Sequence, residues 1–357
     1  MPQLILLPLL LLSLTTSAAP TRPPLLRILA YADLFAPDTL HQFSLTHQVR
    51  IQTILYNNDQ EFEQLLIESD PPIDLAFPAT PALMHYHITN NLYQPLPEHL
   101  QVLDEALEPP LRAPLAQIDP AHRYLIPYLY SFIGLLIDQQ RLQQYLPADQ
   151  PLDSWQLLFE PATLAALGEC TVSVPNEPLL LLPQLLATLQ QSSTAPLDRH
   201  QLEQISARLA LLPTLQIIDY NQLYHQIWNQ EPCIAMIEAQ TQLSLNAELG
   251  RENRYTLVWP REGHIPLMLV AMAIPHNARQ PALAQQLIAY LQQPEPLASI
   301  AAYQQLPSAL HLLNQQLNDV LQEQIHPPLA QQFPLYRQRY SDQEYQIIDA
   351  WWSQISR

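Results

Sequence analysis

The sequence predicts an α/β protein built from two successive units of sheet and helix. Between Leu25 and Thr80, three short apolar runs are separated by two longer amphipathic stretches, the pattern of a β-α-β-α-β unit. A similar alternation resumes at Cys170 and continues to Leu291. Strands that alternate with helices in this way form parallel sheets with helices packed on their faces.

The first unit is predicted from three apolar runs and the segments between them. The expected strands are LLRILAY (25–31), VRIQTILY (49–56) and IDLAFPAT (73–80), and the expected helices lie within 34–48 and 59–69. Ligands of such sheets bind beyond the carboxyl ends of the strands. The segments AYADLF and FPATPA are therefore the first places to look for a binding site.

The middle of the chain is less regular before the second unit begins. We expect an irregular, proline-rich segment over 93–118, then strand-like runs over 124–138 that are interrupted at Pro127-Tyr128 and at Gly134. The second unit has expected strands at 170–174, 215–219, 233–237 and 255–260, with helices at 179–189, 197–212 and 220–230. A further strand at 268–275 and a helix at 282–292 precede a tail, 311–357, that is predicted to be helical.

The N-terminus predicts export. The apolar stretch LILLPLLLL is followed by small and polar residues ending at Ala18, which is typical of a signal peptide over residues 1–18 with a T-S-A cleavage site. The run is too short for a membrane span. An exported chain meets oxidising conditions, so Cys170 and Cys233 are candidates for a disulfide. Two buried free thiols remain the alternative, because sequence alone does not reveal whether the geometry permits a bridge.

Charge and missing motifs exclude several classes of function. The formal net charge is −18, and all 15 basic residues are arginines, so nucleic acid is not an expected partner. The chain contains no G-x-S-x-G, H-E-x-x-H, Walker or dinucleotide-binding motif, so we predict no enzyme and no cofactor. His85-Tyr86-His87 has the spacing of a strand edge but no further ligands, so we predict no metal site.

Four segments carry a resemblance to a known family. They are LRILAYADLFAPDTLHQF, IDLAFPAT, YLIPYLYSFIGLLID, and VWPREG followed by AMAIPHNARQPALAQQLIAYLQQPE. In these segments, over about Leu25 to Leu310, the chain resembles the periplasmic polyamine-binding proteins of ABC importers. The spacing between the WP[KR]EG-like and AIPxNA-like motifs is the most specific feature.

The resemblance implies a type II periplasmic binding-protein fold, in which two α/β lobes close on a ligand. Lobe 1 would comprise 25–132 and 264–310, lobe 2 would comprise 133–263, and the tail 311–357 would pack on both. Gly263 would lie at the hinge, where a residue tolerant of unusual backbone angles suits a chain reversal. A plain strand-to-strand turn is the alternative. Family members are usually monomers, so we expect a monomer.

The resemblance also implies where the ligand binds. Its aromatic-acid loop is represented by Tyr31 and Asp33, but Leu34 replaces the second ring and Leu269 and Val270 replace an acid. A closed cleft strips water from ammonium groups, so each needs a carboxylate, and aromatic faces add cation–π attraction. The candidate ligand-binding residues are Tyr31, Asp33, Tyr86, Tyr128, Tyr130, Glu177 and Glu238.

These implications predict a periplasmic solute-binding protein that delivers a small cationic ligand, such as spermidine or putrescine, to an inner-membrane ABC permease. Replacement of several pocket residues leaves two alternatives open. One is a periplasmic sensor, or a degenerate binding protein, that docks on a membrane receptor. The other is a binding protein for a different small solute.

Overall fold

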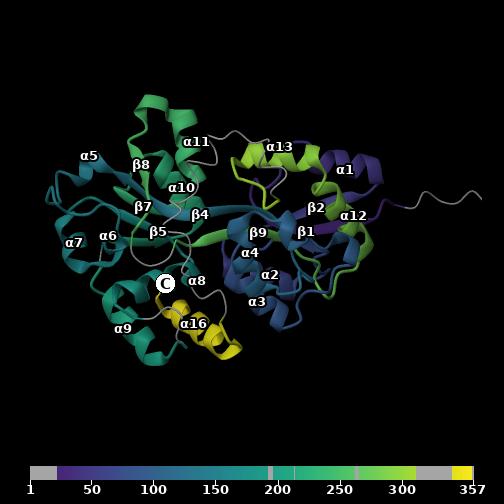
Figure 1. The fold of residues 1–357 in the computed structure, drawn as a ribbon, viewed down its shortest axis with the longest axis horizontal. Coiled ribbons are helices and arrows are strands. Elements are labelled where there is room, and N and C mark those ends of the chain that lie inside the picture. Colours follow the sequence, from purple (N-terminus) through teal and green to yellow (C-terminus); the bar gives the residue numbers. More distant parts are fainter. Residues whose placement is uncertain (1–21, 192–195, 213, 262–264, 311–339, 356–357) are drawn as a thin grey trace, which may run out of the picture.

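Two sheets, each covered by helices, lie at opposite ends of an elongated molecule (Figure 1). The computed structural model describes residues 22–191, 196–212, 214–261, 265–310 and 340–355. The predicted signal peptide, Gly263 and most of the predicted tail lie outside the described residues. No helix within the described ranges is long and apolar enough to cross a membrane.

The first sheet follows the predicted β-α-β-α-β order. Its three strands are parallel in the order β2-β1-β3. The bounds are β1 (Leu25–Tyr31), β2 (Arg50–Tyr56) and β3 (Leu75–Ala76), with α1 (Thr39–His47), α2 (Asp59–Glu68), α3 (Pro81–Thr89), α4 (Pro109–Ile118), α12 (Pro281–Leu291) and α13 (Pro294–Gln304) around them. A bridge between Ala76 and Ala273 joins this sheet to the chain that follows β9 (Leu267–Met272).

The second sheet has the order β6-β5-β7-β4-β8. The strands along this path are β4 (Ile126–Asp138), β5 (Val172–Pro175), β6 (Leu215–Ile218), β7 (Ile234–Glu238) and β8 (Tyr255–Val258), and β9 joins the sheet off this path by pairing with β4. Its helices are α5 (Gln139–Leu142), α6 (Gln156–Phe159), α7 (Pro161–Ala166), α8 (Pro178–Thr188), α9 (Arg199–Leu209), α10 (Tyr220–Trp228) and α11 (Gln240–Leu249). Only β5, β6 and β7 pair in parallel, because β4 and β8 run antiparallel to their partners.

One long strand, β4, pairs with strands toward both ends of the molecule. β4 is 13 residues long and fully buried. It pairs with β9 as far as Phe132 and with β7 from Ile133 onward, so it changes partner between these two residues. The interruption predicted at Gly134 is wrong, because Gly134 lies inside a regular ladder. The one predicted at Pro127-Tyr128 coincides with a register shift between Pro127 and Leu129, although the strand continues through it.

Two helices lie where the sequence did not predict them. α4 occupies part of the segment predicted to be irregular, because Pro109 and Pro110 stand at its first turn, where proline needs no amide partner. His85-Tyr86-His87 lies on α3 rather than on a strand. The ring of His87 is fully buried and bonds to the Tyr93 hydroxyl at 2.8 Å.

Two further connections tie distant segments together. Cys170 and Cys233 form a disulfide beside β5 and β7, with their Cα atoms 5.5 Å apart, which settles the alternative left open by the sequence. α16 (Asp342–Ile355) is the described part of the tail, and it packs against α8 and α9. The ring of its Tyr345 also stacks on Tyr86 of α3 at 3.9 Å, so α16 reaches elements around both sheets.

Candidate ligand-binding site

A cavity of about 480 Å³ lies between the two sheets. Its walls come from the ends of β1, β2, β5 and β7 and from the first turns of α2, α3, α8 and α11. These are carboxyl ends of parallel strands, where such sheets ordinarily bind ligands. The remaining walls come from α10, Ile133 of β4, the start of β9, and the end of α13 with the segment that follows it.

The charged side chains at this cavity are all acidic. Asp33, Asp59, Glu177 and Glu238 line it, and none of the described lining residues is Arg, Lys or His. Asp33 is exposed, whereas the other three are buried. Buried like charges repel each other unless a cation or a proton neutralises them, so the cavity is chemically suited to a positively charged ligand.

Asp59 and Glu177 contact each other at one end of the cavity and occupy corresponding positions in the two halves. Asp59 opens α2 and Glu177 precedes α8, so each lies where a strand ends and a helix begins. The amide of Asp59 donates to Oε1 of Glu177 at 3.3 Å, and the Thr80 hydroxyl donates to Oδ1 of Asp59 at 2.9 Å. Burial raises the pKa of Asp59 to about 6 and raises the pKa of Glu177 well above its ordinary value.

Glu238 lies at the end of β7, among aromatic residues of α10. The hydroxyl of Tyr224 donates to its Oε2 at 3.1 Å. Burial raises the pKa of Glu238. The rings of Tyr220 and Tyr224 lie 6.1 Å apart and that of Trp228 follows at 5.9 Å from Tyr224, so aromatic rings gather next to this acid.

Four of the residues predicted to bind ligand line the cavity: Tyr31, Asp33, Glu177 and Glu238. Asp33 is held in the left-handed region at φ 58°, and its carbonyl accepts a hydrogen bond from Gln304. The hydroxyl of Tyr31 is buried and meets no described partner. Burial, with a contribution from Glu238, raises the pKa of this phenol.

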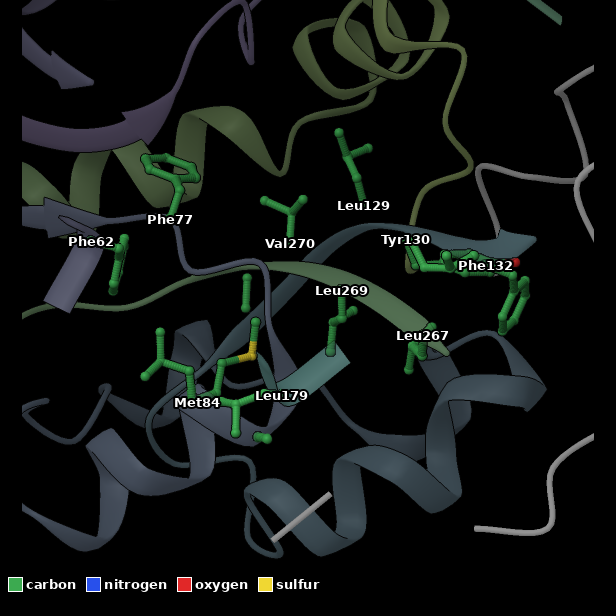
Figure 2. Close-up of a cluster of buried hydrophobic side chains, with 14 of the residues drawn as sticks. Phe62, Phe77, Met84, Leu129, Tyr130, Phe132, Leu179, Leu267, Leu269 and Val270 are labelled. Atoms are coloured by element: carbon green, nitrogen blue, oxygen red, sulfur yellow. The ribbon is translucent and has the colours of Figure 1, made fainter. Parts of the chain in front are cut away.

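The other predicted rings do not line the cavity. Tyr86 points away from it and stacks on Tyr345. Tyr130 is buried in β4 beside Phe132, as Figure 2 shows, with ring centroids 5.9 Å apart. Tyr128 packs against Phe77. The family resemblance places these tyrosines near strand ends. In the structure their directions are set by β4 and by α3, so the three rings pack against other side chains instead of lining the cavity.

The structure adds residues that the sequence reasoning missed, chiefly Asp59, Tyr220 and Tyr224. A signal for Asp59 was present, because it follows a predicted strand of the parallel sheet just as Asp33 does. No such signal marked Tyr220 and Tyr224, since α10 presents several faces and the sequence does not indicate which of them meets the cavity.

Polar contacts cross between the two halves at the cavity. Asn221 of α10 donates to Oδ1 of Asn57 at 2.6 Å, and Ser244 of α11 donates to Oε1 of Gln305 at 2.8 Å. Each contact joins a helix of the second sheet to a segment that packs on the first. The two halves therefore enclose the cavity from both sides.

Two α/β halves that share strands and hold a cavity between their strand ends define the fold of the periplasmic solute-binding proteins. The spermidine/putrescine ABC transporter substrate-binding protein PotD from Streptococcus pneumoniae has this fold. It superposes with a TM-score of 0.69 over 93% of this chain and 98% of its own, at 17% sequence identity. The predicted fold class is thus confirmed.

The sequence comparison identifies more particular relatives. The chain is 25% identical over 289 residues to the putrescine-binding periplasmic protein SpuD of Pseudomonas aeruginosa, covering 79% of this chain and 77% of SpuD. It is 23% identical over 282 residues to the putrescine-binding periplasmic protein PotF of Escherichia coli, covering 77% and 75%. No family model matches the chain. The predicted resemblance to polyamine-binding periplasmic proteins is therefore confirmed, and these relatives are binding proteins rather than enzymes.

Proposed function

We propose that the protein is a periplasmic solute-binding protein that captures a small polyamine, such as putrescine or spermidine, and delivers it to an ABC importer. The observation that carries the proposal is the charge of the cavity, where four acids and no described basic residue line the walls. A buried ammonium group needs carboxylate partners, and three of these acids are themselves buried. We propose no catalytic role for these acids.

The proposed ligand-binding set is Tyr31, Asp33, Asp59, Glu177, Tyr220, Tyr224 and Glu238. Carboxylates at both ends of the cavity would take ammonium groups, and the tyrosine faces would lie along the methylenes or beside the cations. Cation–π contacts of this kind contribute about 0.5–2 kcal/mol each. Tyr86, Tyr128 and Tyr130 are omitted, because their rings pack elsewhere.

We also propose the lobe boundaries expected from the resemblance. The change of partner in β4 between Phe132 and Ile133 supports a first crossing at that point. The proposed second crossing, at Gly263, lies outside the described residues. Rotation about these crossings would open the cavity to the periplasm.

Thermal unfolding with and without ligand tests the proposed function. Ligand at one hundred times its Kd adds about 2.7 kcal/mol of stability, which corresponds to a rise in Tm of several degrees. Putrescine, spermidine and agmatine would be compared with 1,4-butanediol, which has the length of putrescine but no charge. A Tm unchanged by all three amines at millimolar concentration would contradict the proposal.

A pulldown from membranes separates import from sensing. Recovery of an ABC permease with the liganded protein is expected if it delivers its ligand for import. Recovery of a receptor without a permease would instead favour the sensor predicted as an alternative.

A further inference from the structure

The closed end of the cavity carries two carboxylate oxygens that lack a hydrogen-bond donor when both acids are ionised. Asp59 and Glu177 are 9% and 5% exposed, and their side chains hydrogen-bond to each other, which requires a proton on one of them. When both are ionised, Oδ2 of Asp59 and Oε2 of Glu177 are buried without a hydrogen bond from any described donor. Their other oxygens already accept hydrogen bonds. An unsatisfied buried carboxylate oxygen is costly, so this pair has the chemistry of a site that awaits a donor.

The two acids belong to different halves of the molecule. Asp59 stands on α2, beside the first sheet, and Glu177 stands before α8, beside the second. Their side chains interact, and the burial that raises both pKa values opposes having both ionised together. One positive charge between them would therefore remove a repulsion between the two halves at this point.

A wall formed by α16 closes this end. A small second cavity, of about 40 Å³, lies between Asp59, Glu177 and the α16 residues Tyr345, Asp349 and Trp352. The indole of Trp352 donates to Oδ1 of Asn176 at 2.6 Å and so fixes the helix beside Glu177. The second cavity therefore has room for a few water molecules behind the acids.

We infer that Asp59 and Glu177 form one cation site at the closed end of the cavity that takes an unsubstituted terminal ammonium group, and that a proton occupies this site when no ligand is bound. This inference rests on the proposed function. An ammonium group offers three N–H donors, enough to satisfy both free oxygens. Asp59 is then the acid that restores an ammonium partner in a pocket where Leu269 and Val270 stand in place of an expected acid.

Other ionisable groups face the pair and set its charge. Glu63 lies on α2, Asp349 and Tyr345 lie on α16, and Glu238 lies at the end of β7. Tyr56 lies at the end of β2 and Tyr220 at the start of α10. All are acidic or phenolic, so none supplies a competing positive charge. Binding of a diamine near pH 6 is therefore expected to expel a proton from the Asp59 and Glu177 pair.

Calorimetric titration with putrescine tests the inference on the full chain. Asp59→Asn and Glu177→Gln keep the side-chain shapes and are each expected to weaken binding by at least about thirtyfold, as for truncated buried charge pairs. Glu68→Gln, at an exposed acid near the end of α2, removes the same charge and is expected to change the affinity less than about twofold. Thermal unfolding without ligand confirms that each variant is folded.

Two further measurements distinguish a cation site from a structural role. N,N,N′,N′-tetramethylputrescine keeps both charges but has a single N–H at each end, too few for both free oxygens, so it is expected to bind at least about thirtyfold more weakly than putrescine. Titration at pH 6 in two buffers of different ionisation enthalpy is expected to show proton release in the wild type and less release in Asp59→Asn.

The outcomes separate this inference from the proposed function. Wild-type affinity for putrescine in Asp59→Asn, or equal affinity for the tetramethylated diamine, would overturn the cation site while leaving polyamine binding intact. A wild-type protein that binds no diamine or polyamine would overturn both.

Discussion

The hydroxyl group of Tyr345 donates a hydrogen bond to Oε2 of Glu63 at 2.5 Å, which ties the C-terminal helix α16 to α2. Six and seven residues further along α16, Trp351 donates to Ser206 at 2.7 Å and Trp352 donates to Asn176 at 2.6 Å. α16 thus contacts helices and loops around both sheets. A helix bound to both halves restrains their relative rotation.

Replacing Tyr345 with Phe tests this connection. The variant loses one hydrogen bond to a half-buried carboxylate and keeps the ring stacked on Tyr86, so we expect it to lose about 1 kcal/mol of stability. Urea denaturation measures the change. Tyr145→Phe, at an exposed tyrosine, is the matched control and is expected to leave stability unchanged. Equal stability of both variants would mean that the Tyr345 bond is replaced by water.

We expect the protein to lose stability at acid pH because His87 is buried in its neutral form. Burial lowers the pKa of His87 to about 3, whereas an unfolded histidine takes up its proton near pH 6.5. The unfolded chain therefore binds more protons between these values. The contribution of neutral His87 is complete above about pH 6.5 and is lost as the pH falls toward 3.

The variant His87→Gln isolates this contribution. Glutamine can still bond to Tyr93 but does not titrate, so the free energy of unfolding is expected to depend less on pH between 3 and 6.5. Chemical denaturation at a series of pH values measures the slope. His41→Gln, at an exposed histidine of α1, is expected to keep the wild-type slope, and an unchanged slope in His87→Gln would contradict the prediction.

The disulfide between Cys170 and Cys233 is expected to stabilise the protein. It joins residues 63 positions apart, and closing a loop of that length removes unfolded-state entropy worth about 4 kcal/mol in the chain-entropy model. Reduction with dithiothreitol should therefore lower the denaturation midpoint of the wild type. The double variant Cys170→Ser, Cys233→Ser should start from the lower midpoint and show no further response to the reductant.

Gly134 marks a close approach between β4 and β8. A Cβ atom at this position would lie 2.8 Å from Cδ1 of Leu257 and 3.1 Å from the carbonyl oxygen of Val258. We expect Gly134→Ala to lose about 1–3 kcal/mol of stability by overpacking. A double-mutant cycle with Leu257→Ala measures the coupling, since removing the Leu257 side chain should relieve part of the loss.

Much of the fold was predictable because its signals are local. The run LLRILAY corresponds to β1 without a change of bounds, and the α2 and α10 helices follow from amphipathic stretches capped by Asn58 and Asp219. The parallel order of the first sheet followed from alternation of these elements. The local pattern failed at Gly134 of β4, because a strand buried on both faces tolerates a glycine that ordinarily marks an interruption.

The binding site was only partly predictable, because it depends on side-chain directions that no local sequence pattern determines. By itself the sequence determined an α/β chain with acids after its strands, since burial and backbone preference act over a few neighbouring residues. Only the tertiary structure decided that Asp59 meets Glu177 from the opposite half, that Tyr86 turns to α16, and that Cys170 reaches Cys233. These pairings need the packing of whole helices and sheets, which brings together residues far apart along the chain.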